Sequence, residues 1–286
     1  MRTQEVVASF MADCKLRGLS PKTLRGYDCH TKRLIELSPE FPPKSDTIQE
    51  FLATVKGAHN ADAYYRTYHA LGNYAERRCG IPNFMQSVTR PRVPKQIMPT
   101  ISNTELNLLA VFLEKAPARD KAILVLFIDT AIRSGEAALK RKDIGEDRII
   151  IHGKTGYRVA PLSSITRDLL LSLPVYEDGY VFHGTGKYKD IPLGSTGFYK
   201  IVKKYLRMVG YQGGKQYGPQ TLRRSFGVFH LKDGGDLKSL SLILGHSSIT
   251  TTANYYTPLL TEDVIQIHHK HSPIKVFEEA TNESNT

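Results

Sequence analysis

The chain has 286 residues, of which 41% are hydrophobic and 23% are charged. This length is enough for two modest domains, and the ordinary hydrophobic content excludes wholesale disorder. The 39 Lys and Arg residues outnumber the 28 Asp and Glu residues, which leaves a net charge of +11. The excess is spread over the chain before and after Lys95, so it is not a basic tail. Such a distribution favours a polyanionic partner, above all nucleic acid, over a basic protein without a special partner.

The three cysteines, Cys14, Cys29 and Cys79, are odd in number and form no Cys-x-x-Cys pair. They favour neither a disulfide framework nor a zinc site, and reduced thiols in the cytoplasm are the simplest interpretation. The first twenty residues lack the unbroken apolar run of a signal peptide. Because no segment approaches the roughly 18 apolar residues of a membrane span, we expect no membrane association.

The first ninety residues are typical of helices. Ser20 followed by Pro21 predicts a helix start, because Ser caps free N–H groups and Pro needs no donor at the first helical position. This helix continues through Ile35, and two more are predicted over 46–55 and 61–78. The last of them interleaves tyrosines with basic residues, a pattern suited to contact with a phosphodiester backbone, with core packing of the tyrosines as the alternative. These residues are Tyr64, Tyr65, Tyr68, Tyr74, Arg66, His69, Arg77 and Arg78.

The segment 87–99 predicts a linker between two domains. Pro91, Pro94 and Pro99 forbid a continuous helix there. The segment is also basic, which would allow it to lie along DNA; its cations are Arg90, Arg92 and Lys95.

The part of the chain after the linker predicts more helices and one hairpin. Ser102 and Glu105 have the spacing of a capping box, and 120–128 is a strongly apolar helix. Between 147 and 162, β-branched residues flank a glycine-containing turn, which indicates a β-hairpin. Further helical patterns cover 166–173, 195–209, 221–232 and 236–244. The predicted fold class is mainly α with a small β-sheet (α+β), in two unequal domains.

Two segments resemble a phosphate loop and a metal site but lack residues that such sites require. HGTGKYKD at 183–190 resembles the end of a phosphate loop, but its first glycine is missing at the required spacing and Tyr188 replaces Ser or Thr. His268, His269 and His271 have no carboxylate at ligand spacing, so a solvated basic tail is the better interpretation. The sequence therefore supports neither an ATP-using enzyme nor a zinc enzyme, and we expect no cofactor and no metal.

Four scattered segments become informative only in combination. They are TAIRSGEAAL (130–139), HGKTGYR (152–158), GPQTLRRSFG (218–227) and LGHSSITTTANYY (244–256). Each alone is weak, since a single arginine or a hairpin lysine is usually a surface residue. The fourth is the most specific, because Leu-Gly-His is followed nine residues after the histidine by a tyrosine.

In this order and spacing the segments resemble the tyrosine recombinases, which include phage integrases and Xer-like resolvases. LSPKTLRGY at 19–27 looks like the start of the family's core-binding domain. The resemblance implies a helical, SAM-like core-binding DNA-binding domain over 1–86 and a linker over 87–99. It also implies a catalytic domain over 100–270 and a C-terminal tail over 271–286.

The resemblance also implies the site residues. They are Arg133 and Arg223 as the two catalytic arginines, Glu136 as the acidic partner of the catalytic site, Lys154 as the hairpin lysine, His246 of Leu-Gly-His, and Tyr255 as the nucleophile. Tyr256 is the neighbouring alternative to Tyr255, and spacing from His246 favours Tyr255. Gln220 departs from the family pattern, which usually has histidine at this position.

Such a set suits phosphodiester cleavage without a metal. Two arginines can stabilise the charge that develops on the non-bridging oxygens, and a tyrosine forms a phosphotyrosine bond that stores the energy of the broken strand. Lys154 is suited to protonate the leaving 5′ hydroxyl, and His246 to hydrogen-bond the phosphate. Gln220 can donate a hydrogen bond but cannot take the proton of Tyr255. We therefore expect a working enzyme with a modified site.

The expected function is site-specific DNA recombination through a covalent 3′-phosphotyrosine. The alternatives are a DNA-binding protein of the same fold that does not cleave, which Gln220 favours, and a type IB topoisomerase-like enzyme. The expected partner is double-stranded DNA, bound by a homotetramer on paired sites with or without an accessory DNA-bending protein, in the cytoplasm and at the nucleoid of a prokaryotic host. The segment 259–276 is amphipathic and, in the resembled family, such a tail packs into a neighbouring subunit; folding back on its own domain is the alternative. The target sequence and the biological task, from integration to resolution, are not encoded in these patterns.

Overall fold

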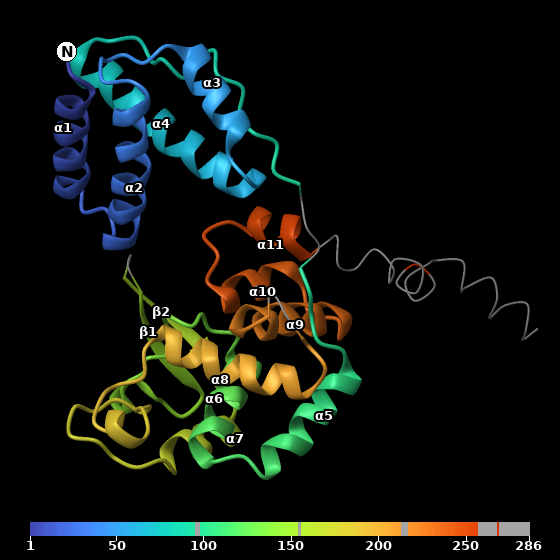
Figure 1. Ribbon diagram of the computed structural model, residues 1–286. Helices are drawn as coiled ribbons and strands as arrows, with labels where there is room; N and C mark the ends of the chain where they lie inside the picture. Colours follow the sequence, from blue (N-terminus) through green and yellow to red (C-terminus); the bar gives the residue numbers. More distant parts are fainter. Residues whose placement is uncertain (95–97, 154–155, 213–216, 257–267, 269–286) are drawn as a thin grey trace, which may run out of the picture. The chain divides into compact units, whose positions relative to one another are not determined.

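The computed structural model describes residues 1–94, 98–153, 156–212, 217–256 and 268. It is mainly helical with one two-stranded sheet, which confirms the predicted fold class (Figure 1). The chain divides into two compact units, Met1–Gln96 and Ile97–Thr286. The division falls within the segment 87–99, where prolines interrupt helical structure.

The first unit is a small helical bundle. Ser20 begins its second helix as expected, because the Ser20 hydroxyl accepts a hydrogen bond from the backbone N–H of Thr23 at 3.2 Å. The helices predicted over 46–55 and 61–78 are present; the first begins and ends one residue earlier, and the second extends three residues further at its start and one at its end. The four helices are α1 (Thr3–Leu16), α2 (Pro21–Leu37), α3 (Ser45–Thr54) and α4 (Ala58–Cys79).

The tyrosines of α4 divide between the core and its margin. Tyr68 is fully buried, and its hydroxyl donates to the carbonyl of His30 at 3.1 Å. Tyr74 is also buried, whereas Tyr64 and Tyr65 are half-buried. The predicted contact of these rings with a phosphodiester backbone is therefore wrong for Tyr68 and Tyr74, since burial of large apolar rings holds α4 against α2 and α3.

The second unit contains the remaining helices and the hairpin. The two strands are antiparallel, with Arg148 opposite Pro161 and His152 opposite Tyr157. Short 3-10 helices lie at Arg141–Asp143 and Gly186–Tyr188. The longer elements are α5 (Asn103–Glu114), α6 (Ala118–Thr130), β1 (Arg148–Gly153), β2 (Gly156–Pro161), α7 (Ser164–Leu171), α8 (Ser195–Met208), α9 (Pro219–Lys232), α10 (Leu237–Leu244) and α11 (Ile249–Tyr256).

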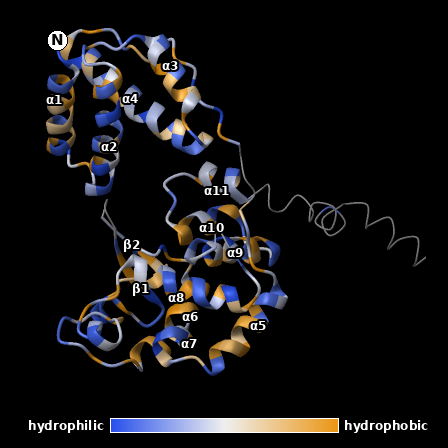
Figure 2. Ribbon diagram, in the orientation of Figure 1, coloured by the Kyte–Doolittle hydropathy of each residue, from blue (hydrophilic) through white to orange (hydrophobic). Residues whose placement is uncertain are grey.

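Helix α6 is the centre of this unit. It is apolar on most of its surface, as Figure 2 shows, and Ile123, Leu126 and Phe127 are fully buried. Helices α7, α8 and α9 pack against it. An apolar helix of this kind is stable only when neighbours cover all its faces. The helices around it therefore bury their apolar faces against α6, and the site described below lies at the C-terminal end of this helix.

The end of the linker segment is hydrogen-bonded to α9. The Nε of Arg224 donates to the carbonyl of Pro99 at 2.8 Å, and the backbone N–H of Ile101 donates to the hydroxyl of Ser225 at 2.8 Å. Directly afterwards, Ser102 and Glu105 form the expected capping box at the start of α5. The chain is thus tied to the second unit from Pro99 onward.

The expectations about membrane spans, cysteines and metal sites can be compared with the described parts of the chain. No helix there is long and apolar enough to cross a membrane. The three cysteines have free thiols, Cys14 buried and the other two exposed. No group of His, Cys, Asp and Glu among the described residues could hold a metal ion; His269 and His271 lie outside them.

Gly227, in the middle of α9, offers a test of the packing behind the site. An alanine Cβ there would collide with the ring of Tyr256, whereas a Cβ at Gly26 in α2 would meet nothing within 4 Å. We expect Gly227→Ala to lower the free energy of unfolding by about 1–3 kcal/mol through overpacking. Gly26→Ala should raise it by about 0.5–1 kcal/mol through helix propensity. Urea unfolding of both variants checks this, and an equal effect of the two would contradict the packing of Tyr256 against Gly227.

Candidate active site

The first part of the site is the turn that follows α6. Ala131 ends this helix in the left-handed region, with φ of 50°, and so redirects the chain toward Arg133. Glu136 then accepts from the backbone N–H of Arg133 and from its Nη1, each at 2.8 Å. The carboxylate therefore holds both the main chain and the guanidinium of Arg133 in place.

Arg223 is the second part, and it is buried within α9 with 4% of its surface exposed. Its two terminal nitrogens donate to the carbonyls of Ala131 and Leu244. Ala131 directly follows α6 and Leu244 is the last residue of α10, so both carbonyls lie at C-terminal helix ends, where the helix dipole is negative. A buried guanidinium is tolerated here because main-chain oxygens replace the water it has lost.

His246 follows the C-terminal end of α10. Gly245 has φ of 60° and reverses the chain there, which places His246 beside Arg223. The Nε2 of His246 lies 3.4 Å from the Nη2 of Arg223, and its Nδ1 lies 2.8 Å from the hydroxyl of Thr252. Because arginine can only donate, Nε2 is the acceptor, and we assign the proton of the neutral ring to Nδ1.

Helix α11 presents its two neighbouring tyrosines in opposite ways. Tyr255 is 41% exposed, whereas Tyr256 is 2% exposed and packs among the residues of α9 and α10. The Tyr256 hydroxyl donates to the carbonyl of Arg223 at 3.4 Å. Burial raises the pKa of Tyr256 to about 12. Of these two tyrosines, only Tyr255 is therefore accessible to a molecule outside the protein.

The structure gathers most of the predicted site residues around one cleft of about 220 Å³. Five of the seven predicted residues line it, and Glu136 lies next to it behind Arg133. Lys154 falls outside the described residues, between the strands β1 and β2. The lining residues are Arg133, Gln220, Arg223, Arg224, His246, Thr251, Tyr255 and Tyr256.

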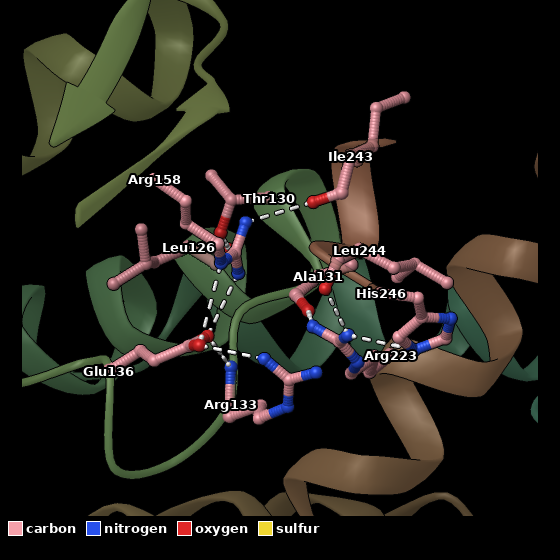
Figure 3. Close-up of polar contacts among 10 residues, drawn as sticks. All are labelled: Leu126, Thr130, Ala131, Arg133, Glu136, Arg158, Arg223, Ile243, Leu244 and His246. Atoms are coloured by element: carbon pink, nitrogen blue, oxygen red, sulfur yellow. Dashed lines mark hydrogen bonds and ion pairs between the residues drawn. The ribbon is translucent and has the colours of Figure 1, made fainter. Parts of the chain in front are cut away.

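Arg158 on β2 joins this network and was not predicted from the sequence. Its Nη2 donates to Glu136 at 2.8 Å and its Nη1 to the carbonyl of Ile243 at 2.9 Å, as Figure 3 shows. The signal in the sequence is its position in the hairpin. Its strand neighbours Tyr157 and Val159 are exposed, so alternation turns Arg158 toward the interior, where an arginine requires partners.

Burial and positive charge together set the proton affinities in the site. Burial lowers the pKa of Arg223 to about 10, with a further contribution from the charge of Arg133. Burial, followed by the charges of Arg223, Arg133 and Arg158, lowers the pKa of His246 to about 4. For Glu136, burial raises the pKa, but the hydrogen bonds from Arg158 and Arg133 outweigh it and leave the pKa below its usual value. At neutral pH the site therefore holds a carboxylate, a neutral imidazole and protonated arginines.

The neutral state of His246 is testable by NMR. We expect its ring signals, assigned by their loss in His246→Gln, to stay those of a neutral imidazole from pH 7.5 to about 5, with a midpoint near 4. Because this pKa lies below the ordinary value of about 6.5, the unfolded chain takes up the proton first. His246 therefore lowers stability as the pH falls from about 6.5 to about 4. A midpoint above 6 in the free protein would contradict the assigned environment.

Comparison with known proteins agrees with this geometry. A sequence profile described as the phage integrase family matches residues 99–262, which is more than half of the chain. The chain therefore belongs to the phage integrase family and is a tyrosine-type site-specific DNA recombinase. Both the family resemblance and the enzyme class predicted from the sequence are confirmed.

Relatives and solved structures cover nearly the whole chain. The tyrosine recombinase XerA of Thermococcus kodakarensis is 26% identical over 275 residues, covering 93% of this chain and 95% of that protein. The structure of the XerH site-specific recombinase bound to a palindromic difH substrate, a post-cleavage complex, has a TM-score of 0.70 at 20% identity, covering 94% of this chain and 85% of that one. The Tn1549 transposon integrase in complex with transposon right-end DNA has a TM-score of 0.70 at 19% identity, covering 90% and 95%. These structural likenesses establish a shared fold.

Proposed function

We propose that Tyr255 is the nucleophile of this recombinase. Its hydroxyl oxygen attacks the phosphorus of a DNA phosphodiester, a bond forms between that oxygen and phosphorus, and the bond to the 5′ oxygen breaks. The products are a 3′-phosphotyrosine and a free 5′ hydroxyl, and the reverse reaction rejoins a strand. The observation that carries this proposal is the contrast between exposed Tyr255, which lines the arginine cleft, and buried Tyr256.

Arg133 and Arg223 would stabilise the charge that develops on the non-bridging oxygens in the transition state. Both guanidiniums are fixed before any substrate arrives, Arg133 by Glu136 and Arg223 by two main-chain carbonyls. Preorganised donors of this kind need no rearrangement during the reaction, which is what makes them effective. This is the role that a metal ion fills in other phosphoryl-transfer enzymes.

The roles of His246 and Gln220 follow from their chemistry. Neutral His246 supports Arg223 through Nε2, and an approaching phosphate would favour a second proton on the ring, which would then donate to the phosphate. Gln220 lines the cleft on the first turn of α9 and can donate a hydrogen bond to a phosphate oxygen, but it cannot act as a base. We propose that Lys154 gives a proton to the leaving 5′ oxygen. The phenol of Tyr255 loses its own proton to solvent, and solvent returns a proton to Lys154, so the exchange balances.

A suicide substrate tests the nucleophile. Incubated with nicked duplex DNA that traps the cleaved strand, the protein should form a covalent adduct visible on a denaturing gel. Tyr255→Phe should abolish the adduct while leaving DNA affinity nearly unchanged, because only a hydroxyl is removed. Tyr256→Phe is the matched control and should retain the adduct.

An adduct in Tyr255→Phe would move the nucleophile elsewhere. No adduct with the unaltered protein would favour a binding protein that does not cleave, and relaxation of any supercoiled DNA would favour a topoisomerase.

We propose that the first unit binds the DNA backbone through two arginines held by one carboxylate. Asp62 is buried in α4 and accepts from the Nε of Arg66 at 2.9 Å and from the Nε of Arg90 at 2.8 Å. Both guanidiniums are exposed, and the group has a net charge of +1. Because each arginine contacts Asp62 through Nε, its terminal nitrogens can serve a phosphate. The half-buried ring of Tyr65 lies beneath Arg90, with its centroid 6.0 Å from the guanidinium carbon.

The salt dependence of DNA affinity tests this assignment. We expect the affinity of the unaltered protein to fall steeply with salt, and Arg66→Ala and Arg90→Ala each to reduce the slope by about 1. Arg148→Ala is the control, because Arg148 pairs one-to-one with exposed Asp147 at 2.6 Å. Slopes equal to that of the control, measured by fluorescence anisotropy on a duplex site, would show that the two arginines bind no phosphate.

For the assembly on DNA, the support is the resemblance to the tyrosine recombinase family. We propose that the first unit serves as the core-binding domain and the second as the catalytic domain. We further propose that four copies join on paired sites through the segment 259–276, with or without an accessory DNA-bending protein. Apart from His268, this segment lies outside the described residues. A cytoplasmic location likewise stays a prediction.

A further inference from the structure

We infer that Arg158 is a positioning residue that sets the places of both catalytic arginines. It does so without lining the cleft, through one contact toward Arg133 and another toward Arg223 and His246. The inference rests on the proposed function, because it takes Arg133 and Arg223 as the groups that stabilise charge. The two contacts come from one guanidinium on β2 (Figure 3).

The first contact passes through Glu136. The Nη2 of Arg158 lies 2.8 Å from one carboxylate oxygen and its Nε lies 3.4 Å from the other. Glu136 uses the same two oxygens for the backbone N–H and the Nη1 of Arg133. The carboxylate is thus shared between two guanidiniums, one fixed on a strand and one facing the cleft. Without Arg158, Glu136 would keep only the partner on its own turn, and its orientation would depend on that turn alone.

The second contact reaches the end of α10. The Nη1 of Arg158 donates to the carbonyl of Ile243, and the next carbonyl along the chain, that of Leu244, accepts from Arg223. Gly245 then reverses the chain, and a Cβ added there would meet the Cδ and Nε of Arg158. The glycine of the Leu-Gly-His motif is therefore required by its positive φ and by the close approach of Arg158. Arg158 packs against the turn that delivers His246 to the site.

The chemistry of the side chain explains why arginine suits this position. A guanidinium carries donors on three nitrogens in a fixed plane, so it can hold a carboxylate on one side and a carbonyl on the other. An ammonium group at the end of a lysine is a single point and cannot reach both. The charge of Arg158 is balanced locally by Glu136, whereas its geometry links β2 to α10.

Substrates with a charged or a neutral scissile linkage distinguish a positioning role of Arg158 from a general structural role. We compare trapped-strand substrates that carry either an ordinary phosphodiester or a neutral methylphosphonate at the cleavage position. If Arg158 acts by positioning charge-stabilising arginines, Arg158→Ala should lose about 10- to 100-fold in cleavage rate on the phosphodiester. On the methylphosphonate, where less negative charge develops, its rate should come within a few-fold of that of the unaltered protein. DNA affinity should change little, because Arg158 does not line the cleft.

Two reference variants, Arg133→Ala and Arg148→Ala, show which interpretation each outcome supports. Arg133→Ala should behave like Arg158→Ala, with a large loss on the phosphodiester and a small one on the methylphosphonate. If Arg133→Ala loses equally on both linkages, the proposed role of the arginines fails. If Arg133→Ala follows the expectation and Arg158→Ala loses equally on both, the positioning role of Arg158 is overturned. Arg148→Ala should match the unaltered protein on both substrates.

Arg158→Lys keeps the charge and most of the volume of the side chain. If Arg158→Ala does not fold, Arg158→Lys is used instead to compare cleavage of the two linkages. We expect it to show the same dependence on linkage charge as Arg158→Ala. Full activity of Arg158→Lys on the phosphodiester would show that charge alone is required and would overturn the inference. Thermal unfolding of each variant, measured alongside, identifies those that fold.

Discussion

The second unit is organised around the burial of one guanidinium. Arg223 has lost nearly all contact with water, and no carboxylate among the described residues pairs directly with it. A buried charge in this state is stable only where oriented dipoles surround it. Those dipoles lie at the C-terminal ends of α6 and α10. Each helix is followed by a residue of positive φ, Ala131 after α6 and Gly245 after α10, and the carbonyls of Ala131 and Leu244 accept from Arg223.

The same constraint explains the difference between two adjacent tyrosines. Tyr256 fills the space that Gly227 leaves open on α9, and its hydroxyl reaches the backbone of Arg223. The buried ring thereby fixes α11, and one helical position earlier Tyr255 is turned outward to the cleft. The exposure of Tyr255, the residue that we propose as the nucleophile, is therefore a consequence of how Tyr256 packs.

Local signals predicted much of the fold and motif spacing predicted most of the site. Ser20 with Pro21, and Ser102 with Glu105, define helix starts because capping depends on a few adjacent residues. No sequence pattern predicted α11, whose residues ITTTANYY are mostly poor helix formers. Thr252 is held by His246 at the end of α10, and Tyr256 packs against segments that are distant in the sequence. Arg158 was missed for the same reason, since its partners are 22 and 85 residues away. The tyrosines of α4 show the reverse case, in which a suggestive local pattern belongs partly to the core.

The hydrogen bonds of Pro99 and Ile101 also define where the second unit begins as a physical object. Helix α5 starts only at Asn103, yet the residues before it are hydrogen-bonded to Arg224 and Ser225, the two residues that follow Arg223. The backbone of the connecting segment is therefore part of the framework behind the cleft. In exchanges of the first unit between recombinases of this kind, the natural junction lies on the N-terminal side of Pro99. A junction placed at the start of α5 would transfer foreign backbone into contact with the helix that carries Arg223.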